Sequence, residues 1–441
     1  MSMERPLLQR MRDDWNGRAR EDAGYYVAFG RRNQSDEEFF ATASDVVRAV
    51  EFELRRLAPA PPRARKALEI GCGPGRLMRP LSRHFGEIHG VDISDEMIRR
   101  ARENLRGVPH AHAHVAENSD LAAFAGDSFD LVYSYAVFQH IPSREVIFGY
   151  LREARRVLKP GAILRFQING LPETARRRDT WSGARVSAAE MADFAAGHDM
   201  QLLALEGIET QYMWVTCRKQ ADGWSAALAG KPAPAPARIR RITNAHGSEP
   251  LAPTRGRFSS ISLWMENLPE DAGLNHLAVR IAGRDGFVSY LGPPEPDGLV
   301  QLNVYLPAQL DTGLQPVEVL WIGRPLCPPA TLRLIPPAPP VPRVVSVTDG
   351  IDLLSETRIV TGSVKIVLEE VARPEALQAM IGGQPLLDLR FFLTDPRMPA
   401  WEVNGRVPAS LAPGVHSLEL SLGGRRFAPV RLEIGPPETR L

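Results

Sequence analysis

A glycine-rich turn is the segment whose residue types and spacing are best suited to chemistry. Lys66 to Leu77 reads KALEIGCGPGRL, so an apolar strand runs directly into glycines and then into a predicted helix. Bare glycine backbone lets a ligand lie against amides at a helix N-terminus. The spacing is G-x-G-x-G rather than the G-x-G-x-x-G of dinucleotide-binding turns, and Glu69 before it would repel a pyrophosphate but suit a cation.

A second acid stands where an adenosine moiety could be held. The next predicted strand ends in Val91 to Ser94, and Asp92 follows Gly75 by 17 residues. A carboxylate at this place can accept hydrogen bonds from both ribose hydroxyls. Ser94 to Met97 is typical of a helix start, with Ser94 as the N-cap and Met97 in the first turn.

These segments, in this order, resemble the class I S-adenosylmethionine-dependent methyltransferases. Ala116 to Leu121 falls where that family contacts the adenine, Asp127 to Val132 opens the fourth strand, and Leu151 to Gly161 looks like the helix and turn before the fifth. The resemblance implies an α/β Rossmann-like sheet of seven strands with S-adenosyl-L-methionine as cofactor. At Glu117 and Asn118 many relatives have Gly-Asp-Ala instead, which leaves open the side chain that holds the adenine amine.

The resemblance also implies a set of cofactor-binding residues, made of the glycine turn, the two acids and the neighbours of the adenine and methionine parts. The set is Glu69, Gly71, Cys72, Gly73, Gly75, Asp92, Ile93, Met97, Glu117, Asn118, Ser134 and Tyr135. Within it, Cys72 is expected to be a small side chain packed beside the cofactor. No metal is expected, because the three cysteines lie far apart without a CxxC pair or a nearby histidine.

Methyl transfer needs an acceptor atom aligned with the sulfonium and, for an acceptor that is protonated at neutral pH, a base. His140 follows the predicted fourth strand, whose carboxyl end faces the ligand crevice, so it is a candidate for proton transfer; its structural alternative is a helix-start residue. Gln167 and Asn169 follow the fifth strand and point the same way. In the N-terminal helical extension, Tyr25 or Tyr26 is expected to close the site and offer a hydroxyl near the substrate.

The elements that would position these residues occupy the first half of the chain. Short Val/Ile/Leu-rich runs alternate with helical stretches up to about residue 220, a pattern that predicts a parallel sheet, and helical patterns almost disappear after it. The predicted parts are a helical extension over 1–50, a methyltransferase domain over 51–220, a Pro/Ala linker over 221–237, and two all-β domains over 238–337 and 343–437.

The two all-β domains repeat each other. Arg238 to Asn244 parallels Arg343 to Asp349, and Leu277 to Gly283 parallels Leu377 to Gly383, which indicates one fold used twice. Short alternating strands with Gly/Pro turns favour an immunoglobulin-like β-sandwich. The domains resemble the immunoglobulin-like IPT/TIG type, and the lack of a cysteine pair in either excludes a disulfide-pinned antibody domain.

Charge and hydropathy limit the partners. The 441 residues include 53 Lys and Arg against 52 Asp and Glu, a net charge of +1, which argues against a protein that holds long nucleic acid. The N-terminus is charged, and no apolar run approaches the roughly 18 residues of a membrane span. We therefore expect a cytoplasmic protein.

The first functional hypothesis is an S-adenosylmethionine-dependent methyltransferase acting on a small-molecule, lipid or sugar (glycan) acceptor. The tandem all-β domains would then serve recognition or assembly, including self-association. The alternative is a non-catalytic binding or scaffold protein that retains the methyltransferase fold, which the intact glycine turn and Asp92 disfavour. A nicotinamide-dependent oxidoreductase is opposed by Glu69 and the glycine spacing.

Overall fold

The protein divides into two compact units. The computed structural model describes residues 4–28, 33–118, 120–173, 178–228, 236–351, 356–395 and 399–436. Unit 1 comprises Met1–Gly17 and Ala43–Ala338, and unit 2 comprises Arg18–Thr42 and Pro339–Leu441. Residues 229–235, seven of the 17 residues of the predicted Pro/Ala linker, lie outside the described residues.

Seven strands build the α/β part of unit 1 in the order β3-β2-β1-β4-β5-β7-β6. Their bounds are β1 Lys66–Ile70, β2 Glu87–Asp92, β3 Ala111–Val115, β4 Phe129–Ser134, β5 Leu158–Ile168, β6 Met200–Glu206 and β7 Met213–Lys219. Strands β1 to β5 pair in parallel, and β7 runs antiparallel to β5 and β6. The Rossmann-like fold predicted from the sequence is confirmed.

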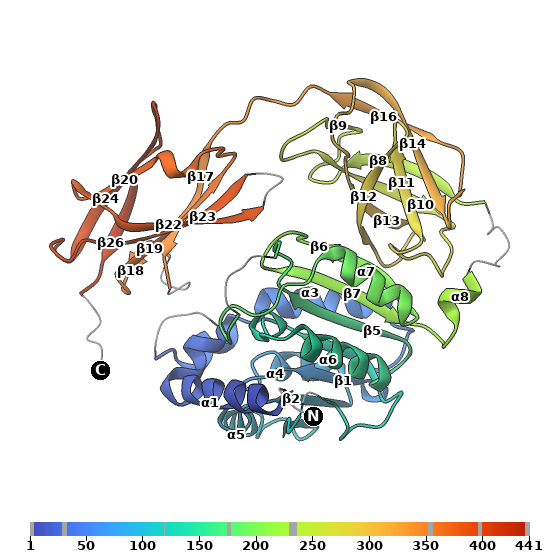
Figure 1. The fold of residues 1–441 in the computed structure, drawn as a ribbon, viewed down its shortest axis with the longest axis horizontal. Helices are drawn as coiled ribbons and strands as arrows, with labels where there is room; N and C mark the ends of the chain where they lie inside the picture. The colour runs from blue at the N-terminus through green and yellow to red at the C-terminus, as the bar shows by residue number, and fades with distance from the viewer. Residues whose placement is uncertain are drawn as a thin grey trace. The chain divides into compact units, whose positions relative to one another are not determined.

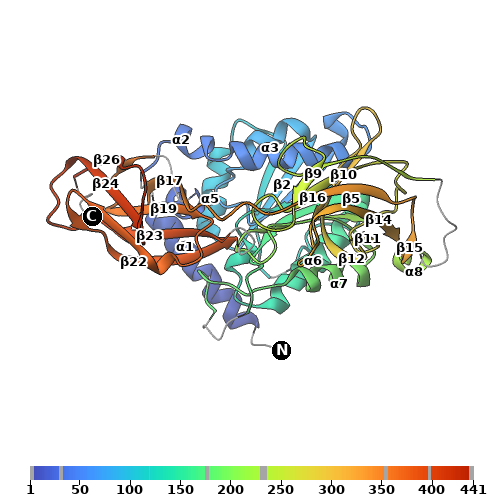
Figure 2. The ribbon, with the colours of Figure 1, turned by 90° about the horizontal axis from the view of Figure 1, so that it is seen from above.

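Helices cover both faces of these strands. The helices of the whole chain are α1 Glu4–Ala28, α2 Asp36–Ala41, α3 Ser44–Glu53, α4 Met78–Leu81, α5 Asp95–Asn104, α6 Arg144–Val157, α7 Ala188–Gly197 and α8 Trp224–Leu228, with short 3-10 turns η1 Leu54–Arg56, η2 Pro62–Ala64, η3 Ser82–His84, η4 Phe138–His140 and η5 Pro374–Ala376. Of these, α2 and η5 belong to unit 2. Figure 2 shows α3 on one side of the strands and α6 and α7 on the other. Ser94, Ser143 and Ser187 begin α5, α6 and α7 by accepting a backbone N–H of the first turn.

Strand register gives the two faces of the sheet different chemistry. Leu68, Val132, Leu164 and Cys217 are aligned neighbours on β1, β4, β5 and β7, and they share an apolar core with α6 and α7. Side chains of a strand alternate between faces, so the next register level points the other way. That level carries Glu69, Tyr133, Arg165 and Thr216, again as aligned neighbours. The face toward α3 therefore carries a line of polar groups.

The first β-module, residues 238–335, belongs to unit 1. Its strands are β8 Arg238–Asn244, β9 Leu251–Pro253, β10 Ser260–Glu266, β11 Leu277–Ile281, β12 Arg284–Leu291, β13 Val300–Tyr305, β14 Gly313–Trp321, β15 Arg324–Pro325 and β16 Ala330–Ile335. One series pairs β8, β10, β13 and β12 in turn, and the other pairs β9, β16, β14 and β11. The two series are joined by pairing of β11 with β12.

The sheet continues from the α/β part into the first β-module. Tyr290 of β12 is aligned with Ala204 of β6, so all these strands form one connected sheet of 16 strands. The expectation of a sheet that ends after seven strands is therefore wrong. The physical reason is that β6 is buried along nearly its whole length, and a buried strand cannot leave its edge unpaired without cost.

The second β-module, residues 343–434, lies in unit 2 (Figure 1). Its strands are β17 Arg343–Asp349, β18 Arg358–Ile359, β19 Ser363–Glu369, β20 Leu377–Ile381, β21 Gln384–Pro385, β22 Leu387–Asp395, β23 Ala400–Arg406, β24 Gly414–Leu422, β25 Arg425–Arg426 and β26 Val430–Ile434. One sheet has the order β17-β19-β23-β22 and the other β18-β26-β24-β20-β21. The two sheets share one apolar core.

Gly90 of β2 lies under the glycine-rich turn and gives the first testable prediction. A Cβ atom there would lie 2.5 Å from the sulfur of Met78 and 2.7 Å from Cβ of Cys72. Gly90→Ala should therefore lower the free energy of unfolding by about 1–3 kcal/mol, measured by urea denaturation. Gly107→Ala is the matched control, because no atom lies within 4 Å of its Cβ position. Equal losses in both variants would contradict the packing argument.

Candidate active site

The glycine-rich turn after β1 has a backbone that only glycine adopts easily. Gly71, Gly73 and Gly75 have φ angles of +73°, +51° and +82°. The amide of Gly71 donates to the carbonyl of Val91 at 2.8 Å, which fixes the turn against the end of β2. A Cβ atom on Gly71 would lie 2.3 Å from Cγ2 of Val137. The turn is thus a bare cradle at the carboxyl ends of β1 and β2.

Asp92 fastens the other side of this cradle. Its Oδ2 atom accepts the amide N–H of Gly73 at 2.9 Å, and its Oδ1 atom accepts that of Ser94, also at 2.9 Å. Burial raises the pKa of Asp92 to about 6, and the backbone hydrogen bonds oppose part of that rise. The carboxylate is therefore held in one orientation, with lone pairs left for ribose hydroxyls.

Glu69 is the buried acid of the site and is only 2% exposed. Tyr133 donates its hydroxyl to Oε2 of Glu69 at 2.8 Å. Burial raises the pKa of Glu69 to about 8, while Tyr133 and the Arg76 guanidinium oppose the rise. The carboxyl group is consequently protonated at neutral pH in the free protein, and a bound cation would favour its ionised form.

Three of the predicted cofactor residues have structural contacts of their own. Cys72 is buried and packs against Gly90, and burial raises the pKa of its thiol, so it stays uncharged. Ser134 donates its hydroxyl to the carbonyl of Ile70 at 2.8 Å. Met97 is 1% exposed in the first turn of α5. These contacts give the three side chains a structural role, and their contact with the cofactor stays a prediction.

Arg12 of α1 ties together the two segments expected at the adenine. Its Nε atom donates to the carbonyl of Ile93 at 3.1 Å, and Nη2 donates to that of Ala116 at 2.9 Å. A weaker contact of 3.4 Å reaches the carbonyl of Glu117. Beside it, Asn118 accepts the Tyr150 hydroxyl on its backbone carbonyl at 3.3 Å. The loops after β2 and β3 are therefore held by helices on either side.

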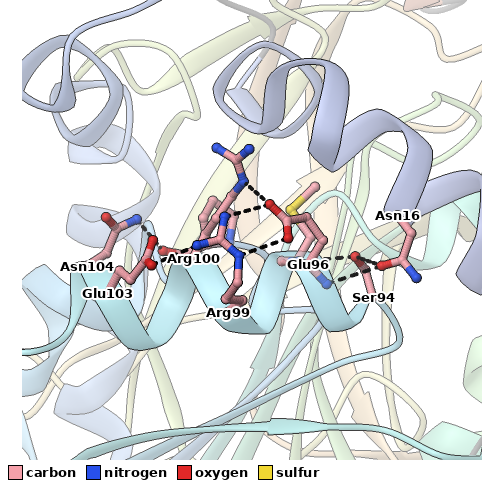
Figure 3. A network of polar contacts seen from close by, with 9 residues as sticks. Asn16, Ser94, Glu96, Arg99, Arg100, Glu103 and Asn104 are labelled. Carbon is pink, nitrogen blue, oxygen red and sulfur yellow. Dashed lines mark hydrogen bonds and ion pairs between the residues drawn. The ribbon is translucent and has the colours of Figure 1, made fainter.

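Asn16 repeats this arrangement one helical turn later. Its Oδ1 atom accepts the Ser94 hydroxyl at 2.7 Å and the Glu96 amide at 3.2 Å, at the start of α5 (Figure 3). Glu96 in turn holds Arg99 and Arg100 along the same helix. Sequence reasoning missed both Arg12 and Asn16. The available signal was their spacing of four residues, which places them on one face of a helix.

His140 lies in η4, after the carboxyl end of β4, and is 6% exposed. Its Nδ1 atom is 3.2 Å from the carbonyl oxygen of Trp181. A carbonyl only accepts, so Nδ1 carries the proton and Nε2 is the basic nitrogen. Nε2 is 3.3 Å from Nε2 of Gln139, and the Trp15 ring meets the imidazole edge-on at 5.5 Å.

The remaining candidates divide between the α/β part of unit 1 and unit 2. Within the described part of the chain, Oε1 of Gln139 and of Gln167 has no hydrogen-bond partner, although both side chains are buried. Asn169 accepts the backbone N–H of Leu171 at 3.1 Å, which is a turn contact. Tyr26 donates its hydroxyl to Glu21 and belongs to unit 2, so its catalytic place stays a prediction.

The described ranges contain no group of three or more His, Cys, Asp or Glu side chains that could hold a metal ion. No described helix combines the length and the apolar character that crossing a membrane requires.

Comparison with known proteins assigns the central part of unit 1. Residues 68–166 match the family model described as a methyltransferase domain. A ubiquinone biosynthesis O-methyltransferase of Cereibacter sphaeroides (strain KD131 / KCTC 12085) is 33% identical over 127 residues, covering 26% of this chain and 46% of the relative. A malonyl-[acyl-carrier protein] O-methyltransferase of Halorhodospira halophila is 33% identical over 152 residues, covering 33% of this chain and 49% of the relative.

The chain thus spans about half the length of these curated relatives. Among solved structures, the geranyl diphosphate C-methyltransferase from Streptomyces coelicolor A3(2) has a TM-score of 0.36 at 17% identity, covering 48% of this chain and 98% of the other. The matched sequence contains the glycine turn, Asp92 and His140. Residues 68–166 therefore match a methyltransferase domain.

Proposed function

We propose that the protein transfers the methyl group of S-adenosylmethionine to an oxygen atom of a small-molecule, lipid or sugar acceptor. The observation that carries the proposal is the glycine cradle flanked by Glu69 and Asp92 inside the methyltransferase domain. The names of the curated relatives, both O-methyltransferases, support oxygen as the acceptor atom. Intact acids beside the cradle do not favour the non-catalytic scaffold.

The residues present fit S-adenosylmethionine, which supplies an activated methyl group when it is bound. Asp92 would take the ribose hydroxyls, because its carboxylate is already aimed by two amides. Glu69 would face the cationic methionine part, where a buried carboxyl group gains a counter-charge. Main-chain and side-chain groups at Ile93, Met97, Glu117 and Asn118 would surround the adenine, and those at Ser134 and Tyr135 the methionine part; this list follows the family resemblance.

His140 would remove the proton of the acceptor hydroxyl through Nε2, with that hydroxyl taking the place of the Gln139 amide that lies 3.3 Å from the same atom. The hydrogen bond from Nδ1 to Trp181 fixes the tautomer and the orientation of the ring. Trp15 and Trp181 flank the imidazole, and apolar rings of this kind limit the access of water. The buried Oε1 atoms of Gln139 and Gln167 are acceptors that a hydroxylated substrate could satisfy.

We further infer that the two β-modules are immunoglobulin-like and serve recognition or assembly. Support comes from the strand repeat, since β8, β11, β14 and β16 stand in the first module where β17, β20, β24 and β26 stand in the second. On β22, at one end of its sheet, Phe392 and Leu393 are 47% and 38% exposed. Exposed apolar side chains on an edge strand favour contact with another chain, and self-association is part of this proposal.

The function is tested by incubating the protein with S-adenosylmethionine and a panel of hydroxylated, thiol and amine acceptors, following release of S-adenosylhomocysteine. His140→Gln should lower the turnover of an accepted substrate by about 10²–10⁴-fold, because the base is lost, and should leave cofactor affinity unchanged. Products from thiol or amine acceptors alone would contradict O-methylation. Full activity of His140→Gln would remove it from proton transfer.

Asp92→Asn should weaken binding of S-adenosylmethionine severely. Hydrogen bonds to a charged acceptor contribute about 1.5–3 kcal/mol each, so affinity should fall at least tenfold, measured by calorimetric titration. Asp130→Asn is the matched control, because that carboxylate at the start of β4 accepts the backbone N–H of Lys66 and a hydrogen bond from the Lys159 ammonium. An affinity loss as large in the control would place the effect in general stability rather than in the site.

Cofactor binding should depend on pH through Glu69. Its pKa of about 8 in the free protein means that binding of a cation near pH 7 must release a proton. Affinity should therefore rise as pH rises from about 6 to 8 and level off above, by up to about tenfold per pH unit. Calorimetry in buffers of different ionisation enthalpy measures the released proton. Glu69→Gln should abolish this release; an unchanged profile would show that Glu69 does not face the cofactor.

A further inference from the structure

A polar line crosses the sheet at one register level, from the cofactor turn to the first β-module. Glu69 on β1 is aligned with Tyr133 on β4, and Tyr133 with Arg165 on β5. The same level continues through Thr216 on β7 and Ala204 on β6 to Tyr290 on β12, where the first β-module begins. The cofactor acid and Tyr290 therefore mark the two ends of one line of neighbouring residues.

A stack of rings and guanidinium groups connects Arg165 with the cofactor turn. The Arg165 guanidinium carbon lies 4.6 Å from the centroid of the Trp214 ring. Trp214 stacks on Tyr135 with centroids 5.7 Å apart and planes inclined by 16°. The guanidinium carbon of Arg76 lies 5.5 Å from the centroid of the Tyr135 ring. Arg76 is also the cation that opposes the rise in the pKa of Glu69 caused by burial. Each contact is of the cation–π or stacking type.

A buried charge cluster connects Arg165 with the first β-module. Nη1 of Arg165 donates to the Thr216 hydroxyl at 2.7 Å and lies 3.6 Å from a carboxylate oxygen of Glu53 at the end of α3. Glu53 also pairs with Arg56, whose guanidinium lies 5.4 Å from the Tyr290 ring centroid. Glu53, Arg56, Arg165 and Tyr290 are each less than one-tenth exposed.

Such a cluster has little freedom to move. Within the described residues, Nε of Arg165 and Nη2 of Arg56 have no hydrogen-bond partner. Both guanidinium groups pair with Glu53, Arg165 also lies 3.6 Å from a carboxylate oxygen of Glu206, and aromatic faces complete the compensation. Removing one partner from a buried ion pair leaves an uncompensated charge, which forces the others to shift or to admit water. A change at Tyr290 should consequently move Arg56, Glu53 and Arg165 together.

We propose that the first β-module positions the cofactor turn, with Tyr290 and Arg165 as positioning residues that act through Trp214, Tyr135 and Arg76. On this basis the first β-module raises the affinity of the site for the cofactor although none of its residues contacts the cofactor. The proposal rests on the cofactor site described above. Binding of S-adenosylmethionine to the unchanged chain tests that site separately, since a chain that binds none would refute the site and not the line of contacts.

The experiment titrates S-adenosylmethionine into full-length variants at several pH values. Tyr290→Ala should weaken binding roughly three- to thirtyfold and move the pH midpoint of binding upward, because a displaced Arg76 no longer lowers the pKa of Glu69. The groups facing Glu69 are Tyr133, Arg76, Asp92 and Cys72, and only Arg76 belongs to the stack. Tyr290→Phe keeps the ring face for Arg56 and should restore the profile of the unchanged chain.

Trp224→Phe is the matched control within the same interface. Its indole N–H donates to Asp271 of the first β-module at 2.7 Å, away from the polar line, so the variant should lose stability without a shift of the midpoint. If Tyr290→Ala fails to fold, Arg165→Lys decides, since it keeps the charge but loses the planar stack on Trp214. A folded Arg165→Lys or Tyr290→Ala with unchanged affinity and midpoint would overturn the proposal, as would an equal midpoint shift in Trp224→Phe.

Discussion

The buried carboxyl group of Glu69 is the constraint around which the site is arranged. An acid that is 2% exposed at the end of β1 is costly to ionise, and its pKa near 8 expresses that cost. Tyr133 and Arg76 offset it only in part. On the proposed function, a cationic ligand would complete the compensation, and the free energy gained on binding would then depend on how well Arg76 and the glycine turn are placed beforehand.

That placement begins with strand register. One residue earlier, Leu68, Val132 and Leu164 are aligned and wholly apolar, and they pack under α6 and α7. Because side chains alternate, the next level must face α3, and there the chain places acid, phenol and guanidinium side by side. Charged groups at this register level are buried because helices cover the sheet, so they need counter-charges that are buried as well. Glu53 at the end of α3 supplies one for Arg165.

Local pattern was enough to predict the glycine turn and the strand series, because each depends on residues close together in the chain. Arg12 and Asn16 were missed because their partners are backbone groups far along the sequence, in the loops after β2 and β3. Arg165 was missed for a different reason. A single arginine inside an apolar strand has no sequence feature that tells which carboxylate will neutralise it.

The boundary between the α/β part and the first β-module is a second feature that local sequence patterns do not describe fully. Proline and alanine near residue 230 mark a change of composition, and composition reflects local propensity alone. Contacts cross that point: Gln201 of β6 donates to the carbonyls of Glu270 and Ala272, and the amide of Leu274 donates to the carbonyl of Leu202 at 2.7 Å. An apolar strand at the end of a sheet exposes backbone donors and acceptors that must be paired or covered. The first β-module supplies that pairing within the same chain. The compact unit therefore continues to Ala338, well past the change of composition near residue 230.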